Sequence, residues 1–240
     1  MRNAAEHTHD YVGNTATDAF SDNEVLAGAD TTCVNGDLST YYWPVIRLRE
    51  NDPAQDQADP ENPHNLGTIL HPSSAEITFE GNAQNEVVEM PDFLQVSTGD
   101  SKGAVERKDS GNARAQWTCS GFEDQISGTQ YPLCPEGSQT IRILEFPGCW
   151  DGENIDSAEN THIEFADEET GECPEGFQAV PQLNYKLSFD IPPGQLFALD
   201  AFPGELHSPI TDHGDFINVM DEELMQEVVD TINSGQQGSS

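Results

Sequence analysis

Two pairs of side chains in this sequence have the types and the spacing to bind a ligand together. His7 and His9 lie two residues apart, and His213 and Asp215 repeat that spacing far along the chain. Residues two apart on a β-strand point to the same face, so each pair would present its side chains together. Two histidines and one carboxylate, with open positions left over, form sites for non-haem iron, manganese or catalytic zinc. We therefore predict that the two pairs converge, either on a divalent metal ion or as groups for acid–base chemistry.

These histidines also have a simpler interpretation, in which they only form hydrogen bonds and tie the early segment to a late loop. His207, six residues before His213, offers a further ligand, although an ordinary loop histidine is the favoured interpretation. Paired carboxylates for glycoside cleavage cannot be selected among 44 acidic residues. Nucleophile elbows, P-loops and dinucleotide fingerprints are absent from the sequence.

A second set of candidates combines aromatic and polar side chains. Trp150 and Asp151 follow Cys149, and His162 comes shortly afterwards. An indole can stack on a sugar ring while a carboxylate and an imidazole bind hydroxyls or transfer protons. A tryptophan beside a cystine is nevertheless more often part of a core.

The segment "GDLSTYYWP" brings Asp37 close to three consecutive aromatic residues. Strand alternation sends Tyr41 and Trp43 to one face and Tyr42 to the other. We expect one of these faces to pack in the core and the other to form an aromatic binding strip.

The composition is strongly acidic, with 44 Asp and Glu against 9 Lys and Arg and a formal net charge of −35. Such a surface repels phosphate backbones and anionic lipids, which excludes nucleic acids and membrane surfaces as expected partners. Three Trp, eleven Phe and five Tyr predict a packed core despite this charge. We favour a folded protein from a saline environment, where screening shortens the repulsion; the alternative is a secreted protein in ordinary salt.

The five cysteines are scattered without a C-x-x-C motif, which argues against a thiolate zinc site. We predict disulfides between Cys119 and Cys134 and between Cys149 and Cys173, as in an exported protein, with Cys33 left as a free, buried thiol. The segment "MRNAAEHTHD" lacks the apolar part of a signal peptide, so the predicted secreted location rests on the cysteines.

Short β-like runs bounded by turn residues recur along the chain: "STYYWPVIRL", "SAEITFE", "NEVVEM", "QTIRILEF", "LNYKLSFDI" and "LFALDAF". One helix is predicted in "MDEELMQEVVDTIN", with Asp221 as its N-cap. Residues 49–65 and 151–176 are expected to be long loops. The fold class is therefore mainly β, a single antiparallel β-sandwich or jelly-roll-like domain over residues 1–233 with long loops, a short C-terminal helix and a flexible tail at 234–240.

Four blocks carry a resemblance to a known family: "EHTHDYVGN", "TTCVNGDLSTYYWPVIRL", "FPGCWDGENIDS" with the following "THIEF" and "CPEGFQAVPQL", and "HGDFINVMDEELMQEVV". In order, spacing and residue type the chain resembles the secreted bacterial and fungal family numbered nineteen ninety-six among the domains of unknown function. Two departures are a short segment before the first histidine pair, and Val219 and Met220 in place of an expected Gly-Trp pair. The resemblance implies an extracellular, polysaccharide-associated setting and no particular reaction. The family's motif positions correspond here to His7, His9, Gly13, Asp37, Tyr42, Trp43, Pro44, Trp150, Asp151, Gly152, His162, His213, Asp215 and Phe216.

We therefore expect a monomeric extracellular protein that binds a polysaccharide or cell-wall glycan, and a hydrolase or lyase if it is an enzyme. The alternatives are a non-catalytic carbohydrate-binding or cell-surface module and a purely structural His/Asp cluster. The catalytic candidates are His7, His9, Asp37, Asp151, His162, His213 and Asp215. The substrate-binding candidates are Tyr42, Trp43 and Trp150. The candidate ligands of a divalent metal ion are His7, His9, His213 and Asp215.

Overall fold

The fold is known from a computed structural model that describes residues 7–50, 55, 57–59, 62–106, 114–235 and 238–239. Its strands are β1 (His9–Gly13), β2 (Thr40–Pro44), β3 (Ile46–Arg49), β4 (Thr68–Leu70), β5 (Ser74–Glu80), β6 (Gln95–Gly99), β7 (Gln116–Cys119), β8 (Thr140–Glu145), β9 (Cys149–Trp150), β10 (Ile163–Glu164), β11 (Gln178–Ala179), β12 (Gln182–Phe189), β13 (Leu196–Leu199), β14 (His213–Ile217) and β15 (Gly238–Ser239). Its helices are α1 (Asn23–Ala27), α2 (Gly103–Glu106), α3 (Glu222–Asn233) and the 3₁₀ turns η2 (Ala158–Asn160) and η3 (Pro209–Thr211). None of the helices in this part of the chain is long and apolar enough to cross a membrane.

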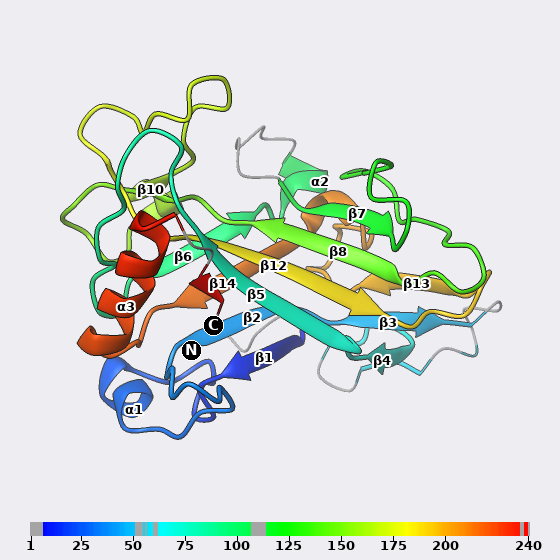
Figure 1. The fold of residues 1–240 in the computed structure, drawn as a ribbon. Coiled ribbons are helices and arrows are strands. Elements are labelled where there is room, and N and C mark those ends of the chain that lie inside the picture. Colours follow the sequence, from blue (N-terminus) through cyan, green and yellow to red (C-terminus); the bar gives the residue numbers. More distant parts are fainter. Residues whose placement is uncertain are drawn as a thin grey trace.

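The described strands form antiparallel sheets (Figure 1). A four-stranded sheet in the order β1-β2-β14-β6 carries His9 on β1 and the pair His213 and Asp215 on β14, and is called the site sheet. His7 lies two residues before β1. A five-stranded sheet in the order β15-β5-β12-β8-β7 is called the back sheet. Two three-stranded sheets, β13-β3-β4 and β10-β9-β11, extend this arrangement. The mainly β, antiparallel fold class predicted from the sequence is confirmed.

The core lies between the site sheet and the back sheet. Trp43 and Tyr41 of β2 contact the ring of Tyr185 on β12, with centroid distances of 5.4 and 6.2 Å. Phe216 of β14 lies 6.0 Å from Phe79 of β5. Because side chains alternate along a strand, the strand residues that alternate with these core positions point away from the core, and they include His9, His213 and Asp215.

The C-terminal helix is confirmed as α3, and the Asp221 carboxylate caps it by accepting a hydrogen bond from the Leu224 amide at 2.9 Å. The strand predicted in "NEVVEM" is wrong, since residues 85–90 form no strand. Val87 is buried there, and its amide donates to the Asn233 side chain at the end of α3 at 2.9 Å. The Val88 amide donates to the Ala179 carbonyl of β11 at 2.8 Å, so the segment bonds to a helix end and to one strand residue without forming a strand.

Both predicted disulfides are confirmed, Cys119–Cys134 and Cys149–Cys173. Cys33 is free as predicted, but it is half-buried and not fully buried. The predicted loop at 49–65 and the predicted tail at 234–240 lie partly outside the described residues.

Candidate metal centre

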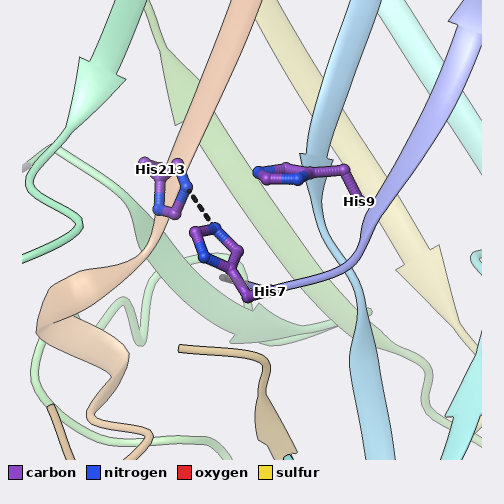
Figure 2. A group of neighbouring side chains, drawn as sticks. All are labelled: His7, His9 and His213. Atoms are coloured by element: carbon purple, nitrogen blue, oxygen red, sulfur yellow. Dashed lines mark hydrogen bonds between the residues drawn. The ribbon is translucent and has the colours of Figure 1, made fainter. Parts of the chain in front are cut away.

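Three histidines meet at one end of the site sheet, on the face that points away from the core (Figure 2). One ring nitrogen from each of His7, His9 and His213 lies within 4.8 Å of the others. The Nε2 atoms of His7 and His213 are 3.0 Å apart, and the ring of His9 lies 4.5 Å from that of His7 and 5.7 Å from that of His213. The predicted convergence of the two histidine segments is confirmed.

Strand register explains the meeting. His9 pairs with Pro44 of β2. On the other side of β2, Asp215 of β14 pairs with Tyr42, so the same antiparallel register continued by two residues brings His213 to Pro44 as well. The two histidines therefore flank one position of the strand between them, and both point outward.

A buried charge network holds the segment between the first two histidines. The amide of Thr8 donates to the Asp200 carboxylate at 3.2 Å, and its carbonyl accepts from the Val45 amide at 3.0 Å. Arg47 donates to the same carboxylate at 2.6 Å and to Asp59 at 2.7 Å. Because both ends of Thr8 are fixed, the flanking imidazoles are held in place before any ligand arrives.

A second buried pair fixes the late histidine. The guanidinium of Arg142 and the carboxylate of Asp212 are fully buried and form two hydrogen bonds. Arg142 also donates to the carbonyls of Pro44 at 2.9 Å and His213 at 3.2 Å. One arginine therefore joins β14 to β2 at the level of the three imidazoles.

The three imidazoles are neutral at neutral pH. Burial, and secondly the nearby His213, lower the pKa of His7 to about 3. Burial lowers the pKa of His213 to about 4, and burial with the neighbouring His7 lowers the pKa of His9 well below its usual value. Neutral imidazole is the form that binds metal ions, so the site needs no deprotonation to accept one.

Hydrogen bonds fix which nitrogens carry lone pairs. Nδ1 of His213 donates to the Thr211 carbonyl at 2.9 Å, which leaves Nε2 of this neutral ring unprotonated. Nε2 of His7 therefore donates to it, and Nδ1 of His7 is buried without a partner among the described residues. A carbonyl behind a histidine is the usual support of a metal ligand. A buried nitrogen without a partner is uncommon, and Nδ1 of His7 can take the ring proton when Nε2 binds an ion.

The separation of the His7 and His213 nitrogens is close to that of two ligands of one ion. Two nitrogens bound to one tetrahedral zinc ion lie about 3.3 Å apart when each bond is about 2.0–2.1 Å. The observed 3.0 Å between Nε2 of His7 and Nε2 of His213 is slightly shorter. Binding would replace their hydrogen bond, move the proton of His7 from Nε2 to its unpaired Nδ1, and shift the two rings slightly apart. Two nitrogens bound to one ion at about 2.1 Å are at most about 4.2 Å apart. The group of three, with separations of up to 4.8 Å, must therefore draw together to supply three of four positions and leave one open.

Asp215, predicted as a fourth ligand, does not belong to the group of three. Two residues of β14 span roughly 7 Å, which carries its carboxylate away from the imidazoles. Its Oδ1 accepts from the Ser97 hydroxyl at 2.6 Å, and burial raises its pKa to about 6. His207 is a loop residue, as favoured from the sequence, and its ring nitrogens contact the carbonyls of Leu199 and His64.

Tyr42, predicted to bind substrate, lies beside the centre. Its ring is 5.6 Å from that of His9 and is stacked on Tyr11 at 5.2 Å. Tyr11 was not among the predicted residues. Its position two residues after His9 on the same strand was the available signal.

Two other predicted residues point into the core instead. Trp43 is 1% exposed and packs on Tyr185, so it is not available to a substrate. Asp37 is fully buried and accepts hydrogen bonds from the Tyr41 hydroxyl and, at 2.8 Å, from the Ser39 amide. Its carboxylate stabilises the turn before β2, and we assign it no part in the metal centre.

The remaining candidates form a separate group near β9. The indole of Trp150 donates to the Asn154 carbonyl at 2.7 Å. The Asp151 carboxylate accepts from the backbone and side chain of the same asparagine. His162 is buried, with Nε2 2.7 Å from the Gln95 carbonyl. These contacts organise the loop, and none of these side chains joins the three histidines.

Comparison with known proteins places the chain in a family. The model described as Domain of unknown function (DUF1996) matches residues 1–219. The chain belongs to this family. Searches of curated proteins and of solved structures find no match. The matched range of the DUF1996 domain includes all three histidines, the two disulfides and both buried arginines.

Proposed function

We propose that the protein is an extracellular metalloenzyme that cleaves a polysaccharide, with one divalent ion bound by His7, His9 and His213. The observation that carries the proposal is the convergence of three neutral imidazoles whose ligand nitrogens lie within 4.8 Å of one another. Support for the extracellular setting comes from the two disulfides, because these bonds persist in oxidising compartments. The polysaccharide is the substrate that the family resemblance implies.

The donor set favours zinc. Imidazole suits zinc and copper, whereas magnesium, calcium and manganese prefer oxygen ligands. Three protein ligands with an open fourth position are typical of catalytic zinc, and an ion held in this way lowers the pKa of its bound water to about 7. The ion would therefore supply a water-derived nucleophile at neutral pH.

The chain's own residues supply the rest of the chemistry. The three imidazoles hold the ion, and the two buried arginine–aspartate networks keep them in position. Asp215 lies on the same face, and its pKa of about 6 keeps part of its carboxyl protonated near neutral pH. The protonated fraction would donate a proton to a leaving oxygen, and the ionised form would accept a hydroxyl of the bound sugar.

A non-catalytic glycan-binding module is the second candidate. Tyr11 favours it, because this residue is 43% exposed and its ring is stacked on Tyr42 beside the centre. Such a surface can hold a sugar ring whether or not a bond is cleaved.

Zinc titration of the chelator-treated protein tests the centre. We expect one ion per chain, tight binding of zinc and copper, and weak binding of magnesium. His9→Ala and His213→Ala should each weaken zinc binding by at least about ten-fold. His71→Ala is the matched control, since this imidazole is exposed and pairs with Asp10 outside the cluster. Equal zinc binding by all three variants would refute the centre.

A panel of polysaccharides then separates cleavage from binding. New reducing ends or unsaturated products that require zinc and disappear in His213→Ala would support the enzyme. Binding without products would favour the module.

A further inference from the structure

One row of side chains crosses the whole site sheet next to the histidines. Tyr11 of β1 pairs with Tyr42 of β2, Tyr42 pairs with Asp215 of β14, and Asp215 pairs with Ser97 of β6. Directly paired residues point to the same face, so these four side chains lie side by side. They share this face with the imidazoles of His9 and His213, which lie two residues before Tyr11 on β1 and two residues before Asp215 on β14.

The β1 side of the row is an aromatic surface. The rings of Tyr11 and Tyr42 are 5.2 Å apart with an interplanar angle of 17°, and Tyr11 is 43% exposed. The edge of Tyr42 contacts His9 at a centroid distance of 5.6 Å. A ligand on these rings would therefore adjoin the metal centre.

The β6 side of the row is polar. Oδ1 of Asp215 accepts the Ser97 hydroxyl hydrogen at 2.6 Å, while Oδ2 has no hydrogen-bond partner among the residues that the structure describes. Asp215 is only partly buried, so a ligand can reach this carboxyl group. The row thus offers a flat apolar surface at one side and an acceptor at the other.

This combination matches the chemistry of a pyranose ring. One face of such a ring presents C–H groups, which pack against the negative face of an aromatic ring. Its rim carries hydroxyls that donate to a carboxylate. Neighbouring strands are about 4.8 Å apart, so a ring placed over Tyr42 can reach Asp215 on the next strand.

The negative charge of the chain disfavours glycans that carry acidic groups. The chain carries a net charge of −35, and Asp215 adds a carboxylate inside the row itself. No lysine or arginine belongs to the row to balance an acidic sugar. Uronic or sulfated units would therefore meet uncompensated repulsion.

We propose that Tyr11, Tyr42, Asp215 and Ser97 form a subsite for one pyranose ring of a glycan without acidic groups. This inference rests on the proposed function, because the subsite would position the adjoining glycosidic bond beside the histidines. Binding in the subsite needs no metal ion, so it can be tested apart from the metal centre.

The test is calorimetric titration of the chelator-treated protein with hexasaccharides of glucose, xylose and N-acetylglucosamine, and with hexagalacturonate. We expect a neutral hexasaccharide to bind and hexagalacturonate not to bind. Tyr11→Ala should weaken the binding by about ten-fold, and Tyr11→Phe should retain it because the ring is kept. Phe122→Ala is the matched control, because Phe122 is an aromatic residue with 38% exposure that lies three residues after β7, outside the row. This variant should bind like wild type. Unchanged melting temperatures exclude misfolding as the cause.

Three results would overturn the subsite: no neutral hexasaccharide binds, hexagalacturonate binds more tightly, or Tyr11→Ala binds like wild type. Its failure is distinguishable from failure of the metal centre. Sugar binding by a protein that takes up no zinc would retain the subsite and remove the metalloenzyme, whereas zinc binding without sugar binding would do the reverse.

Discussion

Zinc binding at the three histidines should persist at pH 5, where ordinary histidine sites have lost most of their affinity. Protons compete with metal ions for imidazole nitrogens. Two histidines with the usual pKa of about 6.5 would together weaken binding by roughly 1,000-fold at pH 5, about 30-fold each. The pKa values of His7 and His213 are about 3 and about 4, so proton competition at pH 5 weakens binding by only about 1.1-fold. The lowered pKa of His9 acts in the same direction.

The assay is competition between the protein and a chelating indicator for zinc at pH 7.5, 6 and 5. A synthetic peptide "EHTHDYVGN" is the control, because its two histidines are solvated and should lose zinc as the pH falls. We expect the affinity of the protein to change by less than about three-fold over this range. A decline of about 1,000-fold in parallel with the peptide would refute the argument that burial keeps these imidazoles neutral.

Three further predictions concern stability. Asp215→Asn should raise the free energy of unfolding by about 1–3 kcal/mol at pH 8 and leave it unchanged at pH 4. Burial raises the pKa of the folded carboxyl to about 6, so its ionisation destabilises the folded protein above that pH, and asparagine removes this cost. Equal effects in urea unfolding at both pH values would contradict this. The melting temperature should rise between about 0.05 and 1 M sodium chloride, since screening shortens the repulsion among 35 excess negative charges, and a flat series would remove the saline-environment interpretation. Replacing Cys149 and Cys173 by serine should lower the free energy of unfolding by about 3 kcal/mol, whereas Cys33→Ser should change it by less than about 1 kcal/mol; similar losses in denaturant unfolding would contradict the pairing.

The sequence predicted the local part of the site and not its assembly. Spacing alone placed His7 and His9 together, because strand alternation is a local rule. The order β1-β2-β14-β6 brings a late strand between two early ones, and no local pattern specifies such an insertion. The same spacing rule predicts that Asp215 shares a face with His213. It does not account for the separation of two residues along the strand, which keeps the carboxylate out of the group of three.

Alternation likewise separated Tyr42 from Trp43 without saying which would be buried. The back sheet decides this, since its Tyr185 covers the face that carries Trp43. The supporting arginines were not predictable at all. Arg47 and Arg142 resemble surface residues in sequence, and only the fold buries each of them against an aspartate.

The proposed ligands His7 and His213 are 206 positions apart along the chain. Of the three clustered histidines, a growing polypeptide therefore contains only His7 and His9 until almost all of its strands have been synthesised. An ion that joined both segments would act as a removable cross-link around nearly the whole domain, with a loop-closure contribution of about 5 kcal/mol in the chain-entropy treatment used for disulfides. Bound metal would then indicate that folding is complete. A chelator would remove this cross-link, whereas reducing agents would break only the disulfides.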